Sequence, residues 1–165
     1  MDSRAKILGH SIHQQLIVFP LGLLGTAVIF DILYLVLGRE NLADVAFWMI
    51  IAGLVGGAAA APFGWIDWFA IPRGTRAKTV GLTHGLTNVT VMVLFIISAW
   101  LRWDEPARPT TAAHATAILG LLLALFGGWL GGELVSRLGV GIHEGAHLNS
   151  PNSLSGRPAS DQSAK

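Results

Sequence analysis

Histidine and carboxylate side chains recur near one end of four apolar segments, where they could bind a metal ion or a cofactor. His10 and His13 precede the first segment, and at their i, i+3 spacing they would share one face of a helix. His84 lies in the third segment, whereas Asp67 and Glu133 lie towards the ends of the second and fourth. Imidazole nitrogen and carboxylate oxygen together suit zinc, iron or manganese. These five residues are therefore the candidate metal ligands.

His84 and Asn88 form the polar pair that lies deepest in an apolar segment, one helical turn apart. A charged group at membrane depth costs about 2.5–3.5 kcal/mol on insertion scales, so polar side chains there need partners. The pair could hold a ligand. It could equally be a polar contact between helices, worth about 0.6 kcal/mol. His10 and His13 could likewise be interfacial residues of a flexible leader.

The two carboxylates also have explanations that involve no ligand. Asp67 could lie in water beside Arg73 or Arg76, which follow it in the next link. Glu133 and Arg137 have the i, i+4 spacing of an exposed ion pair on one helix, which contributes only tenths of a kcal/mol. The metal site therefore depends on whether the fold gathers these groups.

The remaining histidines and Asp31 are expected to have minor roles. Asp31 interrupts the first apolar segment and could be a proton-relay or substrate contact, but we expect it to reach the outer surface together with Tyr34. His114 begins the fourth segment, and we expect water to solvate it. His143 and His147 have i, i+4 spacing, but no second ligand motif accompanies them, so we expect at most an adventitious metal contact.

The composition identifies the elements that must position these groups as transmembrane helices. The chain is 52% hydrophobic and only 13% charged, with a mean hydropathy of +0.56, whereas soluble domains average about 25% charged residues. The net charge of +1 gives no basic surface for nucleic acid. The absence of cysteine excludes disulfides, thiolate metal sites and iron–sulfur clusters.

Four apolar runs are each long enough to cross the bilayer, which takes about 20 helical residues. We predict helices over about 14–37, 45–69, 80–101 and 112–137, joined by short links. Short links favour antiparallel neighbours, so the predicted fold is an all-α, up-down-up-down transmembrane four-helix bundle. Residues 1–147 form this domain, and residues 148–165 are expected to be a disordered tail.

The distribution of Lys and Arg predicts the orientation in the membrane. An even number of crossings places both termini and the middle link on one side. That side carries most of the 11 basic residues, namely Arg4, Lys6, Arg73, Arg76, Lys78, Arg137, Arg157 and Lys165. Both termini are therefore predicted to be cytoplasmic. Glycine recurs every fourth residue on the last three helices, which favours close helix packing inside the bundle or at an oligomer interface.

The chain resembles a family of small bacterial inner-membrane proteins known as domain of unknown function 2231. The resemblance covers residues 10–142 and is strongest in the glycine-rich C-terminal end of the fourth helix. It rests on the segments Gly9-His10-Ser11-Ile12-His13, Phe19-Pro20-Leu21-Gly22, Phe30-Asp31-Ile32-Leu33-Tyr34, Gly64-Trp65-Ile66-Asp67, His84-Gly85-Leu86-Thr87-Asn88 and Gly128-Trp129-Leu130-Gly131-Gly132-Glu133. The chain departs from the family at Ser11 and Gln14, where proline is usual, and at Leu138, where histidine is frequent.

The resemblance implies an inner-membrane location and favours a redox role, because some relatives are fused to Rieske-type iron–sulfur domains. The leading hypothesis is a membrane electron-transfer protein that holds haem b near the cytoplasmic face between His13 and His84. Asn88, Asp67 and Glu133 would orient the ligands, and a redox protein or a second copy would be the partner. The alternatives are a non-haem metal protein that uses the five candidate ligands, and a structural or accessory subunit without a cofactor.

Overall fold

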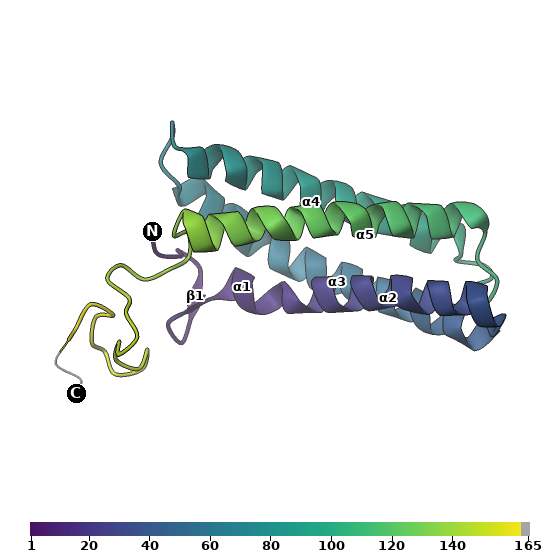
Figure 1. The fold of residues 1–165 in the computed structure, drawn as a ribbon, viewed down its shortest axis with the longest axis horizontal. Helices are drawn as coiled ribbons and strands as arrows, with labels where there is room; N and C mark the ends of the chain where they lie inside the picture. Colours follow the sequence, from purple (N-terminus) through teal and green to yellow (C-terminus); the bar gives the residue numbers. More distant parts are fainter. Residues whose placement is uncertain (163–165) are drawn as a thin grey trace.

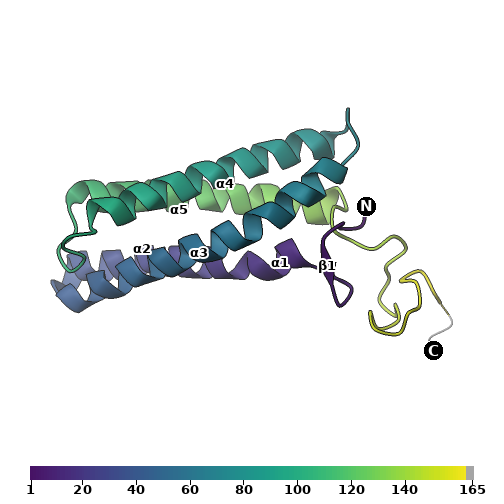
Figure 2. The same ribbon diagram turned by 180° about the vertical axis from the view of Figure 1, so that it is seen from behind.

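Four long helices run antiparallel along one axis in the computed structural model, which describes residues 1–162 (Figures 1 and 2). Each of the four is long and apolar enough to cross a membrane. A short hairpin precedes them, and a single π-helical turn follows them. The elements are β1 (Lys6–Ile7), β2 (His10–Ser11), α1 (Ile12–Leu16), α2 (Val18–Leu37), α3 (Glu40–Ala70), α4 (Arg76–Leu101), α5 (Thr111–Gly132) and η1 (Glu133–Arg137). The predicted all-α fold is confirmed.

The first span is broken at Ile17, between α1 and α2. Pro20 explains the break, because proline has no N–H to donate to the carbonyl of Leu16 and its ring crowds that group. Helices α4 and α5 begin at threonine caps. Thr75 accepts a hydrogen bond from the backbone N–H of Lys78, and Thr110 accepts one from that of Ala113.

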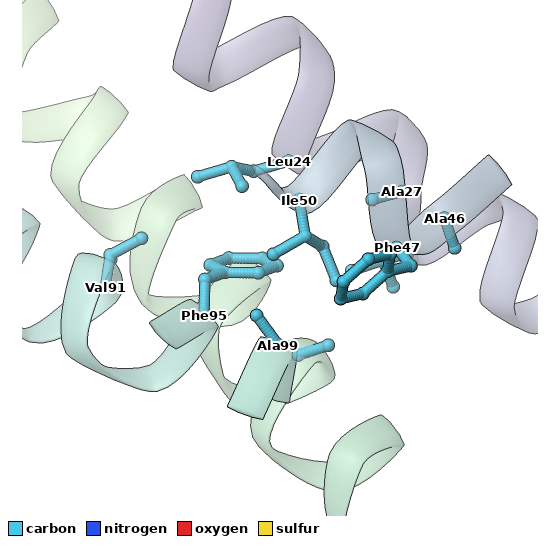
Figure 3. Close-up of a cluster of buried hydrophobic side chains, with 10 residues drawn as sticks. Leu24, Ala27, Ala46, Phe47, Ile50, Val91, Phe95 and Ala99 are labelled. Carbon is cyan, nitrogen blue, oxygen red and sulfur yellow. The ribbon is translucent and has the colours of Figure 1, made fainter. Parts of the chain in front are cut away.

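The outer faces of the helices are apolar, and a narrow apolar core lies between them. Side chains such as Val36 and Trp100 are 74% exposed, as expected of surfaces that lipid covers. Inside, Phe95 of α4 packs beside Ile50 of α3 and Leu24 of α2 (Figure 3). The helices therefore present apolar surface on both sides, and the charged groups lie towards the ends of the bundle.

Both ends of the described chain lie at the same end of the bundle as the link between α3 and α4 (Figure 1). We call this the terminal end and the opposite one the far end. The even number of crossings agrees with this arrangement. The side of the membrane on which the terminal end lies stays a prediction from the basic residues. The tail has turns but no helix or strand between residues 148 and 162, and residues 163–165 lie outside the described part of the chain.

The first and third spans have the same pattern of buried residues when they are aligned 71 positions apart. Leu24 corresponds to Phe95, and each is at most 4% exposed. The buried pairs continue along both helices to the far end. They are Leu24/Phe95, Ala27/Ser98, Val28/Ala99 and Asp31/Arg102. The bundle is therefore built from two similar helical hairpins, α1–α3 and α4–α5.

The second helix of each hairpin carries a glycine at the point of closest approach. A Cβ on Gly53 would lie 2.6 Å from Leu24, and one on Gly120 would lie 2.8 Å from Phe95. The second and fourth spans align 67 positions apart (120 − 53), so that Gly53 corresponds to Gly120 and the two contacts are equivalent in the two hairpins. Glycine therefore lets α3 and α5 approach their partners in the same way, as small-residue stripes do in membrane bundles.

Candidate functional site

His13 and His84 meet near the terminal end, one from each hairpin. Their ring centres are 6.4 Å apart and their planes are at 87°. The two residues occupy equivalent positions in the repeat, so the contact lies on the approximate twofold axis that relates the hairpins. The prediction that these histidines lie at similar depth on different helices agrees with this arrangement.

Both imidazoles are held by the same kind of hydrogen bond. Nδ1 of His13 lies 3.0 Å from the carbonyl oxygen of Ala60 on α3, and Nδ1 of His84 lies 2.9 Å from that of Gly127 on α5. A carbonyl only accepts, so in each neutral ring Nδ1 carries the proton and donates it. Nε2 is then the unprotonated nitrogen in both rings, which is the form that binds a metal.

Two glycines make room for these rings. A Cβ on Gly64 would lie 2.8 Å from Cε1 of His13, and one on Gly131 would lie 3.2 Å from Cε1 of His84. Each imidazole thus packs on a glycine that lies one helical turn after the residue whose carbonyl oxygen accepts its hydrogen bond. The Gly127 and Gly131 stripe, which the sequence indicates as a helix-packing feature, therefore also seats a side chain.

Asn88 packs on His84, as its position one turn further along α4 predicts. Its Nδ2 donates to the carbonyl oxygen of His84 at 2.8 Å and lies 3.3 Å from Nε2 of the ring. The amide thus belongs to the immediate surroundings of the imidazole. We call His13, His84 and Asn88 the histidine cluster.

Asp67 does not face the histidine cluster, because the N-terminal segment binds it. The hydroxyl of Ser3 donates to its carboxylate at 2.7 Å, and the backbone N–H of Arg4 donates at 2.7 Å. The carboxylate is 9% exposed. The proposed position in water beside Arg73 or Arg76 is therefore wrong. Asp67 anchors residues 3–5 to the end of α3.

Glu133 and His10 are also engaged elsewhere. Arg76 donates to the carboxylate of Glu133 at 2.6 Å, so the predicted ion pair with Arg137 is not the one that forms. His10 lies on β2 while His13 lies on α1, so the two do not share a helical face. Its ring lies near Ser153 of the tail.

The five candidate metal ligands are therefore not brought together. In residues 1–162, no group of three or more histidine, aspartate or glutamate side chains is placed to hold a metal ion. The physical reason is that backbone N–H groups and an arginine satisfy the two carboxylates. Only the His13 and His84 pair of the predicted set lies in mutual contact.

A second polar cluster lies buried at the far end. Arg102 donates two hydrogen bonds to Asp31, at 2.8 and 3.0 Å, and a third to the hydroxyl of Ser98 at 3.0 Å. Both charged residues are 1% exposed. The prediction that Asp31 reaches the outer surface with Tyr34 is therefore wrong. A buried carboxylate is stable when an arginine neutralises it, and Arg102 does so across the repeat axis.

His114 belongs to this far-end cluster and is buried rather than solvated, so that expectation is also wrong. It is 5% exposed, and Tyr34 stacks on its ring with centres 5.7 Å apart. Its Nδ1 lies 3.1 Å from the carbonyl oxygen of Thr110, and its Nε2 lies 3.8 Å from Asp31. We call Asp31, Ser98, Arg102 and His114 the far-end cluster.

Sequence reasoning missed the far-end cluster because Arg102 and His114 flank a link and look like interfacial residues. The repeat is the signal that would have found it. Asp31 and Arg102 lie at equivalent positions of the two hairpins, just as His13 and His84 do. Opposite charges at equivalent buried positions predict a pair across the axis.

A family model described as a predicted membrane protein, DUF2231, matches residues 9–144, which is most of the chain. No curated protein matches the chain. No solved structure matches it either. The four apolar helices agree with the description of the family. The chain therefore belongs to the membrane protein family known as domain of unknown function 2231.

Proposed function

We propose that this integral membrane protein transfers electrons by means of one haem b held between His13 and His84. The observation that carries the proposal is the pair of neutral imidazoles, each with Nδ1–H bound to a backbone carbonyl and Nε2 unprotonated. Histidines that bind metals usually donate the other ring nitrogen to such a partner. The donor set thus fits haem b, whose iron His13 and His84 would bind.

The distance between the rings supports the same proposal. The ring centres of His13 and His84 are 6.4 Å apart, and the two histidines are equivalent in the repeat. One imidazole from each hairpin would therefore be available to hold a single iron-containing group.

Bound haem b would supply a one-electron iron centre inside the bundle. The residues of the chain would do three things for it. His13 and His84 would bind the iron, the carbonyls of Ala60 and Gly127 would fix the orientation of the rings, and Asn88 would hold the position of His84. The apolar helices would exclude water, which tunes the potential of a buried haem.

The test is a reduced-minus-oxidised absorption spectrum of the full chain, purified in detergent after expression with ample haem, with iron analysis of the same sample. We expect a sharp reduced α-band with about one iron per chain, as one bound haem requires. Alanine at His13 or His84 should abolish this spectrum, whereas His10→Ala should leave it unchanged because His10 contacts the tail. Colourless protein, or a spectrum that survives both substitutions, would overturn the proposal.

Glycine variants provide a second test that keeps both ligands. Gly64→Ala should displace the His13 ring, because the added Cβ would lie 2.8 Å from Cε1. Haem occupancy should fall. Gly128→Ala is the matched control, since nothing lies within 4 Å of that Cβ. Equal occupancy in the two variants would show that the seating of His13 does not matter.

A structural or accessory subunit is the second candidate, and one observation favours it. Gly128 and Gly132 lie one turn apart on an outward face of α5, with open space where a Cβ would point. A partner helix could approach closely there. This function predicts a complex that dissociates when Gly128→Leu or Gly132→Leu is introduced, and it predicts no haem in the wild type. A complex unaffected by both changes would exclude this use of the face.

A further inference from the structure

The histidine of the far-end cluster lies between two hydrogen-bond acceptors. Nδ1 of His114 is 3.1 Å from the carbonyl oxygen of Thr110, and Nε2 is 3.8 Å from a carboxylate oxygen of Asp31. The side chain is buried, and its Nε2 has no hydrogen-bond partner in the described part of the chain. An unpartnered polar nitrogen in such a place calls for an explanation.

Neither neutral form of the ring satisfies both neighbours. With the proton on Nδ1, the Thr110 bond forms and the lone pair of Nε2 points towards the Asp31 carboxylate. With the proton on Nε2, the carboxylate gains a donor, but the lone pair of Nδ1 then faces the carbonyl. Only the imidazolium, which carries a proton on each nitrogen, donates to the carbonyl and also places a positive N–H at ion-pair distance, 3.8 Å, from the carboxylate.

We propose that His114 and Asp31 form a buried proton-binding site at the far end of the bundle. The ligand is a single proton, taken up by Nε2 of His114. The proton comes from water, and the only covalent bond that forms in the protein is the N–H bond at Nε2. The positive charge of the imidazolium is balanced by the carboxylate, which the new N–H then contacts directly.

The surroundings decide whether the proton is held. From α2, Asp31 and Tyr34 face the ring, and the guanidinium of Arg102 at the end of α4 shares the carboxylate. Arg102 and the N-terminus of α5 oppose the added charge. The carboxylate and the stacked aromatic face of Tyr34 attract it. Asp31 is the nearest of these charges, and it has the lone pairs to accept from both partners.

The two hairpins differ at this position. The position equivalent to His114 in the first hairpin is Phe47, which is buried at 4% exposure. Protonation of His114 would tie α5 to α2, and hence one hairpin to the other, at the far end.

The experiment is ¹⁵N NMR of the full chain, labelled at histidine, in lipid nanodiscs between pH 8 and pH 5, the range in which histidine usually changes charge. The ¹⁵N shifts distinguish a ring with one protonated nitrogen from an imidazolium. His114→Phe identifies the His114 signal. We expect that signal to convert from a ring protonated on Nδ1 alone to the imidazolium.

The role of the carboxylate is tested in the double variant Asp31→Leu/Arg102→Met, which removes both buried charges together. We expect less imidazolium signal from His114 at each pH, because Nε2 then no longer faces a carboxylate. A wild-type His114 signal that keeps a single protonated nitrogen throughout would overturn the site. An unchanged imidazolium signal in the double variant would remove Asp31 from it.

Discussion

Replacing Asp31 by asparagine would leave the guanidinium of Arg102 buried without its counter-charge. The carboxylate accepts two hydrogen bonds from Arg102, at 2.8 and 3.0 Å, and both side chains are essentially inaccessible to solvent. After the substitution, the arginine keeps its bonds to Ser98, at 3.0 Å to the hydroxyl and 3.3 Å to the carbonyl, and the asparagine offers one neutral carbonyl oxygen in place of the carboxylate. The charge would therefore be solvated by neutral acceptors alone.

Breaking a buried ion pair by removing one partner costs about 3–5 kcal/mol, because the remaining charge is uncompensated. The two surviving bonds to Ser98 place the expected loss for Asp31→Asn at about 3 kcal/mol, the lower end of that range. Removing both charges in Asp31→Leu/Arg102→Met should cost much less, since apolar replacements of a buried pair are often neutral or stabilising.

The assay is the free energy of unfolding in mixed micelles, measured by titration with a denaturing detergent and followed by circular dichroism. Glu40→Gln is the matched control, because it breaks an ion pair to Arg108 at the same end in which both side chains are more than half exposed. Solvent screens such pairs, so no measurable change is expected. A loss in Asp31→Asn no larger than in Glu40→Gln would refute the reasoning. So would a double variant that is less stable than Asp31→Asn.

Two further predictions concern helix approach and the N-terminal segment. Gly53→Ala should destabilise the bundle by about 1–3 kcal/mol, because the added Cβ would lie 2.6 Å from a core leucine of α2. Gly22→Ala is the control and should not destabilise it, because its Cβ would face open space. Equal free energies of unfolding for the two variants would contradict this prediction. Burial alone would raise the pKa of Asp2, but the hydrogen bond from Lys6 and the charge of His143 lower it below 3.8. The stabilisation by Asp2 is thus present above pH 3.8 and lost as the pH falls through the lower value of the folded state. Below pH 3.8, backbone amides of residues 1–9 should lose protection from hydrogen exchange as Asp2 becomes protonated. Protection that persists below the folded-state pKa would show that Asp2 does not stabilise this segment.

The helices could be predicted from the sequence because each apolar run is a local signal. The third span was predicted over 80–101 and observed as Arg76–Leu101, and the second was predicted over 45–69 and observed as Glu40–Ala70. The differences lie at the ends, where helices extend into polar residues until a cap or a proline intervenes. The break at Ile17 could have been anticipated from Pro20, which removes one backbone hydrogen bond four residues upstream, although α3 continues unbroken through Pro62.

The partners of the polar residues were harder to predict, because they depend on contacts between distant segments. Asp67 was placed near basic residues of its own link, but backbone N–H groups from the start of the chain reach it first. Glu133 pairs with Arg76 of another helix rather than with Arg137 of its own. Side-chain spacing along one helix cannot reveal a partner from a different helix.

The repeat explains why polar pairs occur at both ends of an otherwise apolar bundle. Residues at equivalent positions of two similar hairpins meet each other near the axis that relates them. Where the two positions hold the same residue, as His13 and His84 do, the result is a symmetric pair with two unprotonated nitrogens. Where they hold opposite charges, as Asp31 and Arg102 do, the result is a buried ion pair that joins the hairpins. The same repeat thus places two like imidazoles together near one end of the bundle and two opposite charges together at the other.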